Sequence, residues 1–209
     1  MTTIVGIQGD SYSLVCVDSR VADVNESGYA TQVATLSTTS SKVAVNGKYI
    51  LGAAGDVRAI NILHHAFTPP SPPANLKGKK LDHFITAKFI PALRECFEQH
   101  GYASPPKETS EHIAEHGSTV FMSIHGVIYI IDGDYSWISD VNGVYAIGTG
   151  AQYALGALQA TIPSKIGSIP WNTAKKLAIK ALSIAAKFDP YTGAPYHTLT
   201  QTIEKKPSN

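Results

Sequence analysis

The chain begins Met1-Thr2-Thr3-Ile4-Val5-Gly6-Ile7, and this stretch says more about the fold than any other. The β-branched residues after Thr2 predict a strand. Once Met1 is removed, Thr2 has a hydroxyl that can attack a carbonyl and an α-amine that can take the hydroxyl proton. A free α-amine ordinarily has a pKa of about 7.7 to 8.0, so it is partly neutral near physiological pH. The alternative interpretation is that Thr2 and Thr3 only start an edge strand.

A second predicted strand ends in a cluster of charge. The apolar run Val15-Cys16-Val17 is followed directly by Asp18-Ser19-Arg20. A turn with a solvated ion pair would explain this pattern and would contribute little stability. The other interpretation is that Asp18 orients a nearby cation.

Three further segments complete the pattern. They are Leu51-Gly52-Ala53-Ala54-Gly55-Asp56, Ala146-Ile147-Gly148-Thr149-Gly150 and Phe188-Asp189-Pro190-Tyr191-Thr192-Gly193. In this order and rough spacing, together with the first two segments, they resemble the proteasome β-type family of N-terminal nucleophile (Ntn) hydrolases, which are threonine peptidases. The start Met1-Thr2-Thr3-Ile4-Val5 is similar to that of the bacterial members that pair with an ATPase ring.

The order of predicted elements is that of an α+β fold, and the resemblance implies a four-layer αββα sandwich with two antiparallel sheets between helical layers. One domain is expected over residues 1–209. The predicted strands are 3–9, 12–18, 42–45, 48–53, several pieces within 118–147, and 196–204; the predicted helices are 56–67, 81–100, 151–161 and 171–187. Residues 21–41 are expected to contain a loop at Asn25–Gly28, residues 102–117 to form a polar loop or short helix, and the tail from 205 to be loose. Pro91 lies inside the second helix, where proline kinks or ends a helix.

The resemblance implies roles for seven residues around the nucleophile. In the family, a Lys held by an Asp lowers the barrier to proton loss from the Thr, a backbone N–H of Gly stabilises the oxyanion, and three further polar residues surround the terminal amine. The matching positions here are Thr2, Asp18, Lys42, Gly55, Thr149, Asp189 and Thr192. Lys48 is the competitor of Lys42, and Gly52 is the competitor of Gly55. Without the resemblance, Lys42 would be interpreted as a solvated surface residue.

The same resemblance assigns the pocket beside the nucleophile. It implies that the substrate contacts Arg20, Val21, Ala44, Ala53 and Val57. The last four are apolar, so a charged substrate side chain would lose its hydration there without gaining a partner. Cleavage after large apolar residues is therefore expected.

Composition excludes several other classes of function. A net charge of +1 gives no electrostatic case for nucleic acid or for an acidic membrane. Two cysteines are too few for a disulfide framework, and Cys16, in a predicted buried strand, is expected to act as a small hydrophobe.

His64-His65 point to different faces of a helix, so they form no metal pair and are interpreted as packing or surface residues. No metal or cofactor is expected, and the absence of a secretory signal favours a cytoplasmic protein.

Three functions remain from the sequence. The first is an active threonine peptidase in a homo-oligomeric ring, fed with unfolded polypeptide by an ATPase unfoldase or another cap. The second is a catalytically silent ring subunit that keeps the fold as a scaffold. The third is another Ntn amidohydrolase that acts on a small amide.

Overall fold

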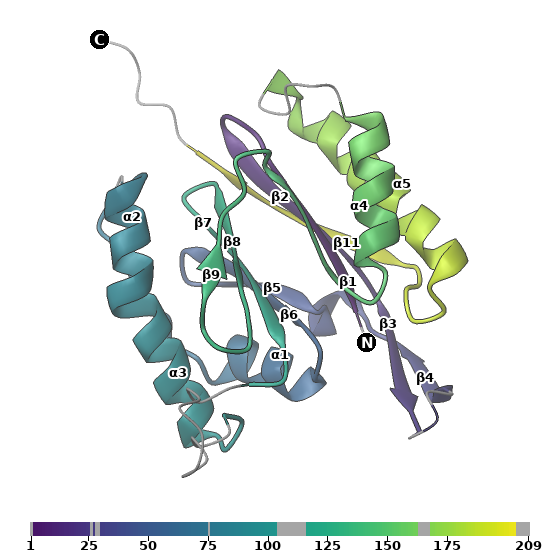
Figure 1. Cartoon of the computed structure of the whole chain (residues 1–209), viewed down its shortest axis with the longest axis horizontal. Helices are drawn as coiled ribbons and strands as arrows, with labels where there is room; N and C mark the ends of the chain where they lie inside the picture. The colour runs from purple at the N-terminus through teal and green to yellow at the C-terminus, as the bar shows by residue number, and fades with distance from the viewer. Residues whose placement is uncertain are drawn as a thin grey trace.

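The computed structural model describes residues 2–25, 27, 30–74, 76–103, 116–162 and 168–203. Met1, most of the predicted polar segment 102–117, part of the predicted loop at 25–28 and the tail from residue 204 therefore lie outside the described residues. The fold is α+β, as predicted, with two large antiparallel sheets (Figure 1).

The first sheet carries the N-terminal strand in its interior. Its strand order is β10 (Val144–Gly148), β1 (Thr3–Gln8), β2 (Tyr12–Asp18) and β11 (Tyr196–Thr202). The turn between β1 and β2 lies at the predicted Gly9-Asp10-Ser11. Ile4 pairs with Ile147 of β10 and with Val17 of β2. The charged segment at the end of β2 and the glycine-rich segment at the end of β10 therefore both lie beside the start of β1.

The second sheet has the order β5 (Val43–Asn46), β6 (Tyr49–Ala54), β7 (Thr119–Ile124), β8 (Val127–Ile131) and β9 (Trp137–Ile138). The predicted Asn46-Gly47 hairpin is confirmed, and Gly47 has the positive φ of 59° that such a tight turn requires. Strand β6 ends at Ala54, immediately before the candidate oxyanion glycine.

Part of the segment 21–41 forms a hairpin that was not predicted from the sequence. Strands β3 (Arg20–Val24) and β4 (Ala30–Thr35) pair in a separate two-stranded sheet, and a short 3₁₀ turn (η1, Thr38–Ser40) follows. The described side chains of β4 are exposed, so no continuous apolar face marked these residues as a strand.

The helices lie in two groups on opposite sides of the strands (Figure 1). One group is α1 (Val57–His65), α2 (Lys79–Phe84) and α3 (Ile90–Gln99), and the other is α4 (Ala151–Thr161) and α5 (Trp171–Phe188). The predicted helix 81–100 is interrupted by a π-helical segment (η2, Ile85–Phe89), where the N–H of Ile90 bonds to the carbonyl of Ile85. Pro91, which has no N–H to donate, follows at once.

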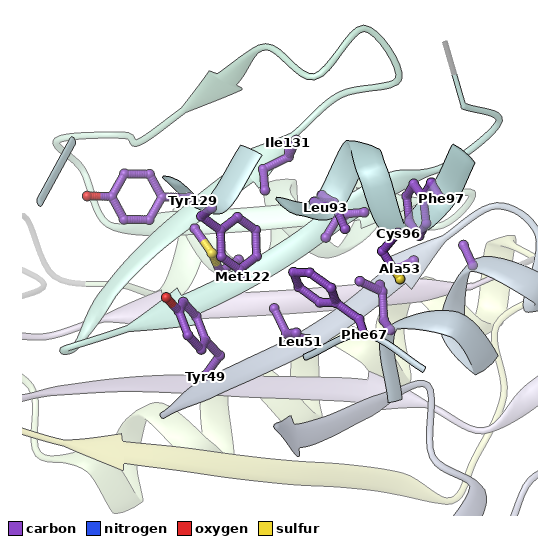
Figure 2. Packing of buried hydrophobic residues seen from close by; sticks show 14 of the residues in the cluster. Tyr49, Leu51, Ala53, Phe67, Leu93, Cys96, Phe97, Met122, Tyr129 and Ile131 are labelled. Carbon is purple, nitrogen blue, oxygen red and sulfur yellow. The ribbon is translucent and has the colours of Figure 1, made fainter. Parts of the chain in front are cut away.

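Buried side chains form three cores. The largest packs the second sheet against α1 and α3 (Figure 2), the second packs the first sheet against α4 and α5, and the third lies between the two sheets. Along β1, Ile4 belongs to the core between the sheets, whereas Val5 and Ile7 face α4 and α5. Because strand side chains alternate, Thr2 shares the side of Ile4, and Thr3 shares the side of Val5.

Candidate active site

Thr2 lies at the start of β1 and is almost completely buried, with 2% of its surface exposed. Its carbonyl oxygen accepts a hydrogen bond of 3.0 Å from the N–H of Thr149, in the turn between β10 and α4. A Cβ at Gly148 would lie 1.8 Å from that carbonyl, so only glycine allows the two segments to approach this closely. The start of β1 is therefore fixed against the end of β10.

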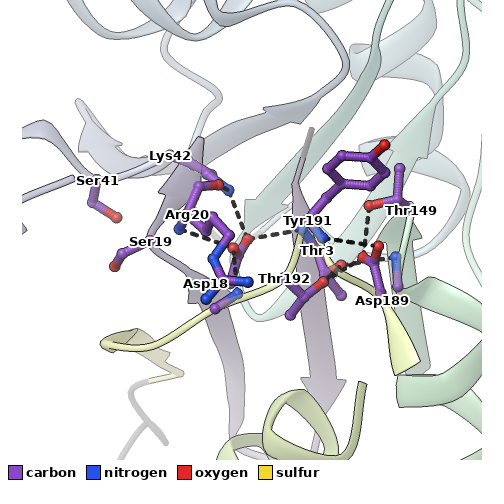
Figure 3. Close-up of polar contacts among 12 residues, drawn as sticks. Thr3, Asp18, Ser19, Arg20, Ser41, Lys42, Thr149, Asp189, Tyr191 and Thr192 are labelled. Atoms are coloured by element: carbon purple, nitrogen blue, oxygen red, sulfur yellow. Dashed lines mark hydrogen bonds and ion pairs between the residues drawn. The ribbon is translucent and has the colours of Figure 1, made fainter. Parts of the chain in front are cut away.

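Asp18 is the hub of the polar cluster at the start of β1 (Figure 3). Its Oδ1 accepts from the N–H of Thr3 at 2.9 Å and from Nζ of Lys42 at 2.7 Å. Its Oδ2 accepts from the N–H groups of Arg20 at 3.0 Å and Gly193 at 3.1 Å. One buried carboxylate thus ties together the starts of β1 and β3, the loop after α5 and the Lys42 side chain.

Lys42 is fully buried and forms a salt bridge with Asp18. Its Nζ also donates to the carbonyl of Arg20. Burial lowers the pKa of the Lys42 ammonium, and the charge of Asp18 opposes that effect. The competitor Lys48 instead donates to the carbonyl of Pro72 at 3.3 Å, so of these two lysines it is Lys42 that the structure brings to Asp18.

A second polar cluster lies on the other side of β1, facing α4 and α5 (Figure 3). Oδ2 of Asp189 accepts from the hydroxyls of Thr149 at 2.7 Å and Thr192 at 2.6 Å. The Thr192 hydroxyl is in turn 2.6 Å from that of Thr3, which accepts from the N–H of Gly150 at 2.9 Å. Because the proton of Thr192 points to Asp189, Thr3 is the donor to Thr192. Thr3 was not among the predicted site residues, although strand alternation places it on this side.

Gly55 follows β6 and has a φ of 131°, a conformation that side chains disfavour. A Cβ here would lie 2.6 Å from Oγ of Ser118, so the turn packs closely against the start of β7. Oγ of Ser118 accepts from the N–H of Asp56 at 3.0 Å and is 2.7 Å from the Tyr102 hydroxyl. Gly52, the competing glycine, is buried within β6 and pairs with Val43.

Thr2 and Gly55 line one cavity of about 510 Å³. The other described residues that line it are Ala54, Thr119, Gly148 and Thr149. The candidate nucleophile, the candidate oxyanion donor and Thr149 therefore share one open space, while Lys42 and Asp18 are fully buried and do not line it.

The residues expected to contact the substrate lie elsewhere. Val21 and Ala44 are half-buried, Val57 is exposed, and Ala53 is fully buried in the core against the helices. The Arg20 guanidinium donates to the carbonyl of Pro190 at 2.7 Å, so the structure shows it holding the loop after α5. None of these five residues lines the cavity at Thr2.

His64 is a packing residue, as interpreted from the sequence. Its Nε2 lies 3.1 Å from the carbonyl of Leu51, and burial lowers its pKa. Among the described residues, no group of three or more His, Cys, Asp or Glu side chains is placed to hold a metal ion. Within the same residues, no helix is both long and apolar enough to cross a membrane.

Comparison with known proteins places this geometry in a known fold. No family model and no curated protein matches the sequence. Solved structures do match. BPH from Thiobacillus denitrificans in complex with epoxomicin has a TM-score of 0.68 at 15% identity, over 97% of this chain and 100% of that one.

Two other structures agree. The eukaryotic HslV from Trypanosoma brucei has a TM-score of 0.57 at 18% identity, over 96% of this chain and 99% of that one. The helical assembly of the Anbu complex from Pseudomonas aeruginosa has 0.61 at 16%, over 96% of this chain and 81% of that one. The chain therefore has the proteasome β-type fold of the Ntn hydrolases.

Proposed function

We propose that this protein is a threonine-type endopeptidase that degrades unfolded polypeptides, with Thr2 as the nucleophile after Met1 is removed. The proposal includes a single domain over residues 1–209 with the four-layer αββα arrangement. The observation that carries it is the buried Lys42–Asp18 pair hydrogen-bonded to the start of β1, with Gly55 and Thr2 in the same cavity.

The chemistry follows from these positions. The α-amine of Thr2 takes the hydroxyl proton while Oγ1 attacks the carbonyl carbon of the substrate. The N–H of Gly55 donates to the oxyanion that forms, and the Lys42 charge stabilises the developing alkoxide of Thr2. The α-amine then gives its proton to the leaving amine, and water hydrolyses the ester on Thr2 in the reverse sequence of proton transfers.

The acyl half of the substrate is proposed to lie along Val21, Ala44 and Val57. Their apolar side chains favour a large apolar residue before the cut bond, because a charged one would be desolvated without a partner. The buried position of Ala53 supports only an indirect role for this residue, as part of the wall behind the pocket.

Confinement is the proposed source of selectivity for unfolded chains. We propose that copies of this chain assemble into a ring that works in the cytoplasm and receives substrate from an ATPase unfoldase or another cap. The likeness in fold to a protein solved as a helical assembly supports self-association. Light scattering at micromolar concentration and physiological salt tests it, and a monomer there would contradict the ring.

Cleavage by matched variants tests the activity. The wild-type protein, Thr2→Ala and Thr2→Ser are compared on unfolded casein, on a peptide library and on small acyl amides, with Lys48→Met as a control. We expect peptide cleavage by the wild-type protein and the control, and none by Thr2→Ala. Cleavage of small amides alone would favour another Ntn amidohydrolase, and no cleavage by assembled wild-type protein would favour the scaffold.

Epoxomicin, which is bound to BPH in the structure named above, suggests a covalent probe. An epoxyketone has two electrophilic carbons, and a free N-terminal Thr has two nucleophiles. The hydroxyl adds to the ketone and the amine opens the epoxide, so no atoms are lost. The two new bonds close a cyclic adduct on Thr2. A chain that retains Met1 has no free α-amine at Thr2 and is not expected to form this adduct.

A further inference from the structure

The described residues that line the cavity at Thr2 lie toward one side of the nucleophile. In the second sheet, β5 and β7 flank β6 on opposite sides, and in the first sheet, β2 and β10 flank β1 on opposite sides. The cavity is lined from β7 and β10, through Thr119 and Gly148. Lys42 and Asp18 lie on the β5 and β2 side, as does Ala44 of the expected acyl pocket.

Thr119 directs its side chain into the space between the two sheets. Along β7, Phe121 belongs to the core between the sheets and Ser123 bonds to Ser13 of the first sheet at 2.5 Å, whereas Val120 and Met122 face the helices. Alternation therefore puts Thr119 on the side of Phe121 and Ser123, facing Thr2.

The hydroxyl of Thr119 is available to a ligand. It is half-buried and makes no hydrogen bond to any residue that the structure describes. Among the described lining residues, the one other hydroxyl besides that of Thr2 belongs to Thr149, which donates to Asp189 at 2.7 Å. No charged side chain is found among the described residues that line the cavity.

The direction of proton transfer identifies which half of the substrate enters this cavity. The leaving amine must receive its proton from the α-amine of Thr2, at the very start of β1. That end of the chain lies against Gly148 and Thr149, because the Thr2 carbonyl accepts from the N–H of Thr149. The leaving half therefore departs on the β10 and β7 side, and the acyl half lies on the β5 side.

We propose that the cavity binds the side chain of the residue that follows the cut bond, and that Thr119 selects among such residues through its hydroxyl. This inference rests on the proposed peptidase function. A neutral, hydrogen-bonding side chain such as Thr, Ser or Asn is favoured over an apolar side chain of the same shape. A charged side chain is disfavoured, because the lining offers it no ion partner.

Competition between matched peptides tests the subsite. Two peptides that differ only in Thr against Val after the cut bond are mixed with the enzyme, and the ratio of their kcat/KM values is read by mass spectrometry. Wild-type enzyme is expected to prefer the Thr peptide by about twofold to tenfold, the range that one neutral hydrogen bond supplies. In Thr119→Val the ratio is expected to fall to about one, and Thr119→Ser should retain the preference.

Val57→Thr is the matched control. It exchanges the same two isosteric residues as Thr119→Val but in the reverse direction, and it does so in the pocket proposed for the acyl half of the substrate. It is expected to change the preference before the cut bond and to leave the Thr/Val ratio unchanged. An unchanged ratio in Thr119→Val, or a ratio moved by Val57→Thr instead, overturns the subsite. A coumarin amide of the acyl half separates the failure of the subsite from the failure of the peptidase function. If wild-type enzyme releases coumarin but its Thr/Val ratio is near one, only the subsite is overturned. If wild-type enzyme cleaves neither the coumarin amide nor the peptides, the peptidase function is overturned with it.

Discussion

Removal of Asp18 should unfold the protein, whereas removal of its partner Lys42 should leave it folded and inactive. Both side chains are fully buried and 2.7 Å apart. They differ in what they hold. Asp18 accepts from three backbone N–H groups, those of Thr3, Arg20 and Gly193, besides the lysine. Asp18→Ala therefore leaves three backbone N–H groups and a buried ammonium without their acceptor.

The magnitudes separate the two variants. A hydrogen bond to a charged group contributes about 1.5 to 3 kcal/mol, so the three N–H groups alone account for roughly 4.5 to 9 kcal/mol. The orphaned ammonium adds roughly 3 to 5 kcal/mol. A domain of this kind has only about 5 to 15 kcal/mol in total. Lys42→Met leaves Asp18 with its three N–H donors and also removes a desolvated cation, so about 3 kcal/mol is expected.

Urea unfolding followed by circular dichroism measures both free-energy costs, and thermal unfolding followed in the same way gives the Tm values. For a chain of this size, about 3 kcal/mol corresponds to roughly 6 to 12 °C in Tm. Lys42→Met should therefore be folded at 25 °C with peptide cleavage lost, and Lys48→Met, on the same hairpin, should keep both properties. The reasoning is refuted if Asp18→Ala is folded with a Tm no lower than that of Lys42→Met.

Three further outcomes follow from the site and its surroundings. Ser118→Ala should lower kcat about tenfold with a smaller change in KM, because the turn that holds the N–H of Gly55 loses its support; steady-state kinetics on one peptide decides this. Burial lowers the pKa of His116 to about 4 in the folded state, so protons favour the unfolded state and stability should fall by about 3 kcal/mol as the pH drops from about 6.5 to 4. Urea titrations of His116→Phe should lack that part of the loss, and an equal loss in the variant would contradict it. The pH–rate profile should rise as the Thr2 amine loses its proton and should fall as the Lys42 ammonium loses its proton. Because burial lowers the pKa of Lys42, the fall should begin below pH 10.5. A profile that stays flat up to pH 10.5 would contradict the role of Lys42.

Local patterns were sufficient for most elements of the fold. The Asn46-Gly47 turn predicted the β5–β6 hairpin, and the alanine-rich period of 171–187 predicted α5, because both signals depend on neighbouring residues alone. The β3–β4 hairpin was not predicted, since the described side chains of β4 are exposed and form no continuous apolar face. The π-helical segment before Pro91 depends on how the helix accommodates the missing N–H, which the position of the proline alone does not settle.

The site depended more on resemblance than on local pattern. Nothing near Lys42 in the sequence says that it reaches Asp18, because the contact joins two sheets across 24 residues. Ser118 and Tyr102 were not predicted as supports of Gly55 for the same reason. Thr3 is different: alternation along β1 was readable from the sequence and places its hydroxyl opposite that of Thr2.

The most direct test of the central claim is the intact mass of the protein before and after treatment with the epoxyketone, with the adduct mapped by peptide sequencing. The expected result is a chain that lacks Met1 and gains the mass of one whole epoxyketone at Thr2, while Thr2→Ala gains none. An active protein that retains Met1, or an adduct that forms equally in Thr2→Ala, would contradict the claim that Thr2 is the nucleophile.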